Sequence, residues 1–278
     1  MTADVLHPFE RYDQSTIAPG RSQFLIQLSY QGAYFKGVPP QPGLPSVSDA
    51  LQQEVTHILG RPLKALMFTA RTDKGVNAEV NYATGWLKDG PRVPDAGLQI
   101  APQHPGLGPI TILPVPEKTF ARTLALSKTY SYRFRDGFLA DEKESLTYWD
   151  ILPTLSIPAM QEAAASLVGT HNFESFQVRP GKEERNTECT LYSVNIEPVF
   201  KNNHREIILT IRGNRFLRRM VRTLAGTLAE IGCGLMPAQA MTHLLEKPQP
   251  QWIGPTAPAR GLTLQNIELS KELSKRFD

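Results

Sequence analysis

The chain has 278 residues, 41% hydrophobic and 21% charged, which is the composition of an ordinary folded protein with one large or two smaller cores. No window approaches the length of about 18 consecutive apolar residues that a membrane span needs, and the polar N-terminus lacks the apolar centre of a secretory signal. Only Cys189 and Cys233 occur, too few for a disulfide framework or a four-cysteine zinc site, so a reducing compartment, the cytoplasm, is expected.

The net charge of +3 is unevenly distributed along the chain. Residues 1–118 carry 10 basic and 10 acidic side chains, whereas residues 201–222 carry seven basic residues and one acid, a local net charge of +6. Such a concentration of positive charge is typical of a surface that meets a phosphate-rich partner.

In the first half, the residue patterns predict the order β-α-β-β-α-β. Alternating apolar residues predict a strand over 22–30, and helical spacing predicts a helix over 46–60 that begins at Ser46 and ends at Gly60. The remaining predicted elements are strands over 62–69, 80–86 and 109–115 and a short helix near 95–103.

The second half repeats this order with insertions. A helix is predicted from Ser156 to Gly169. The other predicted elements are strands over 121–126, 129–134, 190–200, 205–213 and 261–269 and helices from about 216 and from 237. An α+β fold is therefore expected, with two ferredoxin-like halves that form a mainly antiparallel sheet flanked by helices. The predicted parts are a flexible N-terminal tail over 1–20, a first half over 21–117 and a second half over 118–278.

Four arginines near the start of the helix predicted from 216 share one face. At 100° per residue they fall within an arc of about 100°, opposite the apolar residues of the same segment. Like charges at this spacing destabilise a helix, so a face of one sign without balancing acids favours contact with phosphate over a merely solvated face. These residues are Arg215, Arg218, Arg219 and Arg222.

The loop TARTDKGVN, residues 69–77, places Arg71, Asp73 and Lys74 between two predicted strands. A hairpin tip needs polar residues but does not need this charged cluster. Positive neighbours favour the ionised form of a carboxylate even when it is partly buried, so Asp73 is a candidate for chemistry that uses a charged oxygen. The short motif alone is weak evidence for catalysis.

Four further sequence blocks accompany this loop in a fixed order. They are LSKTYSYRF (126–134), GTHNFESF (169–176), FLRRMVRTLAGTLAEIG (216–232) and RGLTLQ (260–265). Together the five blocks closely resemble the TruA-type tRNA pseudouridine synthases, over residues 22 to 269 or thereabouts. The resemblance implies the pseudouridine-synthase fold, no cofactor, no metal, and a homodimer that acts on uridines of the tRNA anticodon stem-loop, at tRNA positions 38–40.

The resemblance also implies roles for individual residues. Asp73 matches the catalytic aspartate of the family, and Arg71 matches its partner arginine. Tyr130 matches the tyrosine that packs on the target base, and Arg222 matches the basic residue that pairs with the aspartate. Leu264 resembles an apolar wall of the base pocket. The residues then expected to contact RNA are Lys74, Arg215, Arg218 and Arg219.

The implied reaction suits a carboxylate. Conversion of uridine to pseudouridine breaks the C1′–N1 bond and joins C1′ to C5, and the cleavage leaves positive charge on the sugar. Asp73 could stabilise or capture that charge, as in glycosidases, or could remove the C2′ proton to give a glycal; the sequence leaves both open. Tyr130 can offer an aromatic face to a flipped-out uridine, and its hydroxyl can relay a proton, whereas Tyr132 is expected in the core.

Two other functions remain open, a glycosylase-like enzyme that releases the base and a catalytically inactive or retargeted RNA-binding relative. Three positions also depart from the family pattern. Asn77 stands where a histidine is common, Gln177 where an arginine is common, and Val38 begins Val-Pro-Pro-Gln where Trp-Gln-x-Gln is usual. These residues are expected to touch RNA, so the choice of substrate is the property they would change.

Overall fold

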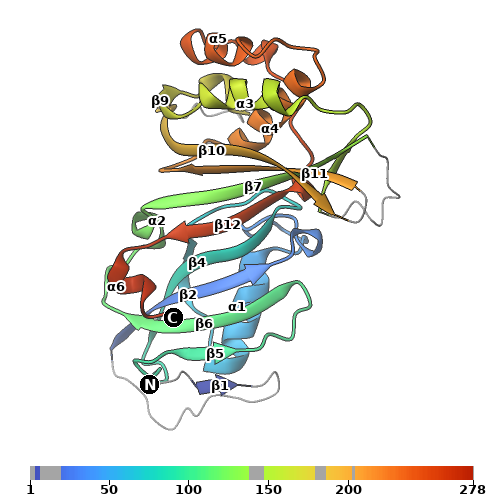
Figure 1. Cartoon of the computed structure of the whole chain (residues 1–278). Coiled ribbons are helices and arrows are strands. Elements are labelled where there is room, and N and C mark those ends of the chain that lie inside the picture. The colour runs from blue at the N-terminus through green and yellow to red at the C-terminus, as the bar shows by residue number, and fades with distance from the viewer. Residues whose placement is uncertain (1–3, 7–19, 138–146, 179–185, 202–203, 278) are drawn as a thin grey trace. The chain divides into compact units, whose positions relative to one another are not determined.

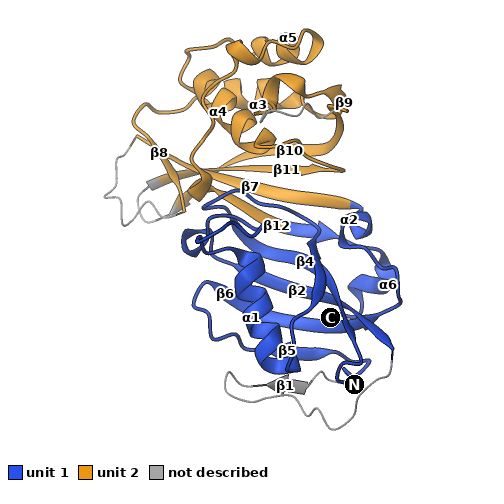
Figure 2. Ribbon diagram, turned by 180° about the vertical axis from the view of Figure 1, so that it is seen from behind, with its two compact units in different colours: residues 1–126, 266–278 blue, residues 127–265 orange. Residues whose placement is uncertain are grey.

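The computed structural model describes residues 4–6, 20–137, 147–178, 186–201 and 204–277. The chain folds as two compact units, unit 1 with residues 1–126 and 266–278 and unit 2 with residues 127–265 (Figure 2). The boundary lies later in the chain than the predicted one at 117, and the C-terminal segment belongs to unit 1. In the part of the chain that the structure describes, no helix has the length and apolarity needed to cross a bilayer.

Unit 1 is built on a sheet with the strand order β1-β5-β6-β2-β4, and β3 also pairs with β4 (Figure 1). Only the β1–β5 pair is parallel among the pairs described in this unit. The order β6-β2-β4-β3 is that of a ferredoxin-like half. The strands are β1 (Asp4–Leu6), β2 (Arg21–Tyr30), β3 (Lys64–Phe68), β4 (Asn77–Lys88), β5 (Leu98–Ile100) and β6 (Leu107–Val115).

Helix α1 (Val47–Leu59) covers one face of this sheet (Figure 2). The Ser46 hydroxyl accepts a hydrogen bond from the backbone N–H of Asp49 at 3.0 Å, which satisfies one of the free donors at the helix start. Gly60 ends the helix in the left-handed conformation, with φ of 75°. The apolar stripe of α1 is buried, so the predicted helix and both of its ends are confirmed.

Two predicted elements of unit 1 are wrong. The segment near 95–103 forms β5 rather than a helix, because Gly97 adopts a φ of 90° and interrupts any helix there. Residues 121–124 form helix α2 (Ala121–Leu124) rather than a strand. The Ala121 backbone is bonded to the Thr84 and Thr69 hydroxyls at 3.1 and 3.0 Å, so those side chains take the place of a strand ladder. The short helices η1 (Gly32–Tyr34) and α6 (Lys271–Ser274) complete unit 1.

Part of the predicted N-terminal tail is ordered. Residues 4–6 form β1, which pairs in parallel with β5. The other residues of that predicted tail, 1–3 and 7–19, lie outside the described residues.

Unit 2 has the strand order β12-β7-β11-β10-β9, in which residues 262–265 of β12 belong to this unit. The order β12-β7-β11-β10 is again ferredoxin-like, and helices α3, α4 and α5 lie together on one side of the strands (Figure 1). The strands are β7 (Ser127–Asp136), β8 (Trp149–Ile151), β9 (Gly169–Asn172), β10 (Glu188–Lys201), β11 (His204–Gly213) and β12 (Leu262–Glu268). The helices are α3 (Ile157–Ala165), η2 (Glu174–Phe176), α4 (Met220–Gly232), α5 (Ala240–Glu246), η3 (Pro250–Trp252) and η4 (Ala259–Gly261). The predicted α+β class with a mainly antiparallel sheet is confirmed.

Helix α3 follows its predicted start but not its predicted end. The Ser156 hydroxyl accepts a hydrogen bond from the Ala159 N–H at 3.5 Å, as a cap should. The helix ends at Ala165, and Gly169, predicted as its end, begins β9 with a φ of 117°.

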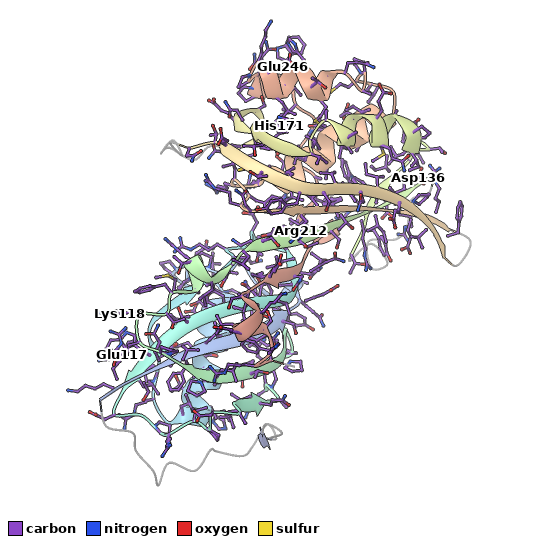
Figure 3. The ribbon with its side chains drawn as sticks, turned by 60° about the vertical axis from the view of Figure 1, so that its left-hand side comes forward. Glu117, Lys118, Asp136, His171, Arg212 and Glu246 are labelled. Atoms are coloured by element: carbon purple, nitrogen blue, oxygen red, sulfur yellow. The ribbon has the colours of Figure 1, made fainter. Side chains whose placement is uncertain are left out.

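Ion pairs fix the far end of β7 inside unit 2. Asp136 is the last residue of β7 (Figure 3). It forms an ion pair with Arg205 and accepts a hydrogen bond from the Leu155 N–H at 2.6 Å. Arg135 pairs with Asp150 at 2.6 Å. The hydrogen bond with Asp136 raises the pKa of Arg205 above its ordinary value, so the guanidinium stays charged. These contacts hold Asp150 and Leu155 against the sheet.

Candidate active site and RNA-contacting residues

The candidate residues divide between the two units. Arg71, Asp73 and Lys74 belong to the loop between β3 and β4 of unit 1. Those that belong to unit 2 are Tyr130, Arg215, Arg218, Arg219, Arg222 and Leu264.

The backbone at the start of the unit 1 loop is fixed by Asn81 of β4. The Asn81 side chain is 0% exposed. Its oxygen accepts from the N–H groups of Ala70 and Tyr82 at 3.2 and 2.9 Å, and its nitrogen donates to the Ala70 carbonyl at 2.9 Å. A buried amide that is bonded on both sides in this way leaves Ala70 one conformation.

Gly32 allows the loop to pack closely against the chain that follows β2. A Cβ on Gly32 would lie 2.4 Å from the carbonyl carbon of Gly75, so this position has no room for a side chain. The Gly32 N–H donates to the Asn77 side-chain oxygen at 2.8 Å. The Val38 N–H donates to the Thr72 carbonyl at 3.3 Å. The loop is therefore held on both sides of Asp73.

The charged residues of the loop are more exposed than the residues next to them that the clamp holds. Arg71 and Lys74 are exposed and Asp73 is half-buried, whereas Thr72 and Val76 are buried. A carboxylate on a fixed backbone, flanked by two cations, can stabilise positive charge that develops on a bound substrate.

In unit 2, Tyr130 lies on β7 and is 9% exposed. Its ring meets the Phe216 ring edge to face, with the centroids 5.0 Å apart. Leu264 of β12 is fully buried. Tyr132 is also fully buried and donates its hydroxyl to the Pro258 carbonyl at 2.8 Å, so its predicted core position is confirmed.

The predicted arginine face does not form. Helix α4 begins only at Met220, because Arg219 adopts a left-handed φ of 60° just before it. Asn214 holds the preceding turn, since its side-chain oxygen accepts from the N–H groups of Thr190 and Arg215 at 2.9 and 2.6 Å. Arg222 is the one arginine of the four that α4 contains, and Arg215, Arg218 and Arg219 lie in the turn. The four arginines therefore do not share one helical face, on which their like charges would repel each other.

Arg222 is tied to the chain before β12. Its Nε donates to the Ala257 carbonyl at 2.7 Å, and the Ala257 N–H donates to the Arg222 carbonyl at 3.1 Å. Gly226 lets this segment approach, since a Cβ there would lie 1.7 Å from the Pro255 carbonyl oxygen. The direction of the Arg222 guanidinium therefore depends in part on residues 254–257.

The paired ends of β7 and β11 carry basic residues that the sequence prediction did not bring together, and two of them, Lys128 and Arg212, were not named as candidates. The Arg212 Nε donates to the Ser127 hydroxyl at 3.1 Å, and its guanidinium lies over the exposed Tyr192 ring, 5.1 Å from the centroid. Lys128 pairs across the strands with Gly213. Burial lowers the pKa of Lys128, and the charge of Arg215 lowers it further. We call Lys128, Arg212 and Arg215 the cationic rim, because they surround the paired ends of β7 and β11, with Arg212 on one face of the sheet and Lys128 on the other. Strand register assembles it from segments 85 positions apart, which no local sequence pattern reveals.

Two of the three departures from the family pattern include a buried side chain. Val38 is 1% exposed and Gln177 is 8% exposed, so the expectation that these two side chains touch RNA is wrong. Residues 39–41, which complete the first departure, are exposed. Asn77 is half-buried and holds the Gly32 N–H in unit 1. For residues 39–41 and Asn77 the contact with RNA stays a prediction.

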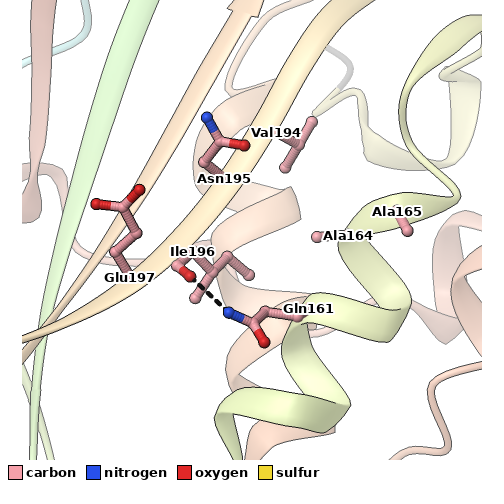
Figure 4. A pocket seen from close by; sticks show the side chains of 7 residues that line it. All are labelled: Gln161, Ala164, Ala165, Val194, Asn195, Ile196 and Glu197. Atoms are coloured by element: carbon pink, nitrogen blue, oxygen red, sulfur yellow. Dashed lines mark hydrogen bonds between the residues drawn. The ribbon is translucent and has the colours of Figure 1, made fainter.

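A shallow pocket in unit 2 lies apart from these residues. It is lined by residues of α3 and β10, and Gln161 crosses it to donate to the Ile196 carbonyl at 2.9 Å (Figure 4). None of the candidate residues lines it. Within the described ranges, no three His, Cys, Asp or Glu side chains gather in a way that could hold a metal ion.

Comparison with known proteins supplies the family. The sequence profile described as tRNA pseudouridine synthase matches residues 163–269. The chain is 28% identical over 246 residues to tRNA pseudouridine synthase A of Myxococcus xanthus, covering 87% of this chain and 90% of that protein. It is 30% identical over 250 residues to tRNA pseudouridine synthase A of Chlamydia muridarum, covering 88% and 91%. It is 30% identical over 273 residues to tRNA pseudouridine synthase-like 1 of Mus musculus, covering 89% and 94%. The chain therefore belongs to the TruA-type family of tRNA pseudouridine synthases, which are isomerases.

Proposed function

We propose that this protein isomerises uridine to pseudouridine in the anticodon stem-loop of tRNA, at tRNA positions 38–40, with Asp73 acting at the ribose of a flipped-out uridine. Membership of the family supports this proposal. The observation that carries the site is the loop of unit 1, where the half-buried Asp73 stands between two cations on a backbone clamped from both sides.

The candidate site residues have the following roles in the proposed reaction. The C1′–N1 bond breaks, the uracil turns, C1′ joins C5, and the proton leaves C5. Asp73 stabilises or captures the cationic sugar, or removes the C2′ proton, and Arg71 and Arg222 are its proposed basic partners. Tyr130 packs on the base and Leu264 forms an apolar wall, while Lys74 contacts the RNA. A primary isotope effect from deuterium at C2′ supports the glycal route, and its absence supports attack at C1′.

The test of the proposed function is the reaction of wild-type protein with tRNA that lacks the modification. Carbodiimide labelling is expected to map new pseudouridine to the anticodon stem-loop, with no free uracil in solution. Free uracil would identify a glycosylase instead. Bound tRNA in which every uridine is unchanged would identify an RNA-binding relative without activity. We also propose a homodimer, which light scattering of the purified full chain tests directly.

The cationic rim and Tyr192 are expected to contribute to tRNA binding. Arg212→Gln and Tyr192→Ala should each raise the Kd for tRNA by about three- to tenfold, because a phosphate contact and a stacking face are lost. Arg212→Gln should also lower the slope of log Kd against log salt by about 1. The control is Lys247→Gln, which removes one exposed positive charge from the end of α5 in the same unit. Equal effects of all three variants would contradict a specific role for the rim.

Lys128→Met is expected to weaken tRNA binding and to stabilise the protein. The pKa of Lys128 is lowered by burial and by Arg215, so folding disfavours its charged form. The gain in Tm should be full at neutral pH and should shrink as the pH rises toward the ordinary pKa of lysine, where the side chain is neutral in both states. Thermal unfolding of both proteins across this pH range measures it. A Tm below that of the wild type at neutral pH would contradict the argument.

A further inference from the structure

A buried path of hydrogen bonds leads from β4 through β2 to the residue that precedes Asp73. The Asn81 nitrogen donates to the Tyr30 hydroxyl at 3.1 Å, and the Tyr30 and Thr72 hydroxyls are 2.9 Å apart. Tyr30 is 3% exposed and Thr72 is 7% exposed, so water does not compete for these groups.

The Asn81 end of the path has a defined donor. Both hydrogens of the Asn81 amide nitrogen are used, one by Tyr30 and one by the Ala70 carbonyl. In the bond between the Tyr30 and Thr72 hydroxyls either group can donate. Burial raises the pKa of Tyr30 to about 12, although the bonds to Thr72 and Asn81 lower it, so the phenol stays protonated at physiological pH. The path therefore connects the Asn81 amide to the Thr72 side chain through a neutral phenol.

The hydrogen bond with Tyr30 holds the side chain of Thr72, which the contacts of Asn81 and Val38 with the loop backbone do not hold. Asn81 alone fixes the backbone of Ala70, and Val38 meets only the carbonyl of Thr72. The Tyr30 hydroxyl holds the Thr72 side chain itself. Because Asp73 is the next residue, a rotation at Thr72 would turn its carboxylate away from a bound ribose. Displacements of about 1 Å at a reacting group can cost about a hundredfold in rate.

We propose that Tyr30, Asn81 and Thr72 are positioning residues of the proposed pseudouridine synthase, which aim the Asp73 carboxylate at the ribose without touching the RNA. This inference rests on the proposed function. The three buried polar side chains would then raise the rate of the chemical step. This effect is separate from their contribution to the stability of the fold.

The principal test is Tyr30→Phe, which removes only the hydroxyl. Under single-turnover conditions with saturating protein, the rate of pseudouridine formation is expected to fall by about ten- to a hundredfold. The Kd for tRNA should stay within about twofold, because none of the three residues meets the RNA. The control is Tyr82→Phe, which removes another buried tyrosine hydroxyl of the same sheet, bonded to Gln27 at 3.3 Å. It should lower the Tm to a similar extent and leave the rate within about twofold.

If Tyr30→Phe does not fold, two variants of Thr72 test the same hydrogen bond. Thr72→Val removes the hydroxyl and keeps the shape, and is expected to slow the reaction as Tyr30→Phe does. Thr72→Ser keeps the hydroxyl and should restore most of the rate. The double variant Tyr30→Phe with Thr72→Val should be no slower than the slower single variant, because both remove the same bond.

Three results would overturn the inference: rates of Tyr30→Phe and Thr72→Val equal to that of Tyr82→Phe, a tRNA Kd that rises by as much as the rate falls, or Thr72→Ser as slow as Thr72→Val. Failure of the proposed function is a separate outcome, because wild-type protein would then form no pseudouridine. Wild-type activity that Asp73→Ala abolishes and Tyr30→Phe leaves intact would reject the positioning role alone.

Discussion

Replacing Asp73 with asparagine is expected to slow pseudouridine formation at least about a thousandfold, which corresponds to about 4 kcal/mol of activation free energy. Asparagine has the shape of aspartate but cannot carry the charge that stabilises or captures the sugar cation, and it is a poor base at C2′. The clamp contacts of Ala70, Thr72 and Gly75 are unchanged by this substitution, so the loop should keep its conformation. Single-turnover rates with unmodified tRNA measure the effect.

The Kd of Asp73→Asn for tRNA should equal that of wild-type protein or fall below it, because a negative charge that faces a polyanion is lost. Glu79→Gln is the matched control, since Glu79 is an exposed acid on β4 a few residues later. It should leave the rate within about twofold. A rate for Asp73→Asn within tenfold of the wild type would contradict the assigned role of Asp73.

Replacing Gly226 with alanine is expected to destabilise the protein by about 3 kcal/mol or more. In an open helix the same change would stabilise by up to about 1 kcal/mol. Here the new Cβ would lie 1.7 Å from the Pro255 carbonyl oxygen, and backbone atoms must move to admit it. Because the displaced segment includes the carbonyl of Ala257 that accepts from Arg222, activity should fall as well. Denaturant unfolding and single-turnover rates measure the two effects.

Gly232→Ala on the same helix is the control for this change. Its Cβ would lie 2.8 Å from the Met160 sulfur, a flexible side chain that can turn away. Its loss of stability should be clearly smaller, and the Arg222 contact should survive. Equal losses of stability for the two variants would show that the close approach of Pro255 is not the reason why Gly226→Ala destabilises the protein.

Elements with local signals could be predicted from the sequence. Helix α1 has an apolar stripe, a capping Ser46 and a left-handed Gly60 within one short window, and it forms as expected. The segment at 98–100 carries no such signal, and its pairing with β6 together with the φ of Gly97 decides its structure. The predicted start of α4 is wrong for the same reason. Asn214 and Thr190 are distant in sequence, and the hydrogen bonds between them hold the turn that precedes the helix.

The candidate site shows the same limit. The charged loop around Asp73 could be recognised because its residues are contiguous and match the family. The clamp that supports it joins residues of β2, β4 and the chain after β2, which only the folded sheet brings together. The register of β7 and β11 likewise assembles the cationic rim. Conversely, helical spacing alone suggested a face of four arginines, which the left-handed Arg219 removes.

Release of tritium from tRNA whose uridines are tritiated at C5 reports the proposed isomerisation itself, because C5 loses its hydrogen only when it joins C1′. Wild-type protein is expected to release tritium in an amount equal to the pseudouridine mapped in the anticodon stem-loop, and Asp73→Asn is expected to release none above background. The account would be contradicted by wild-type protein that binds this tRNA and releases no tritium, or by equal release from the variant.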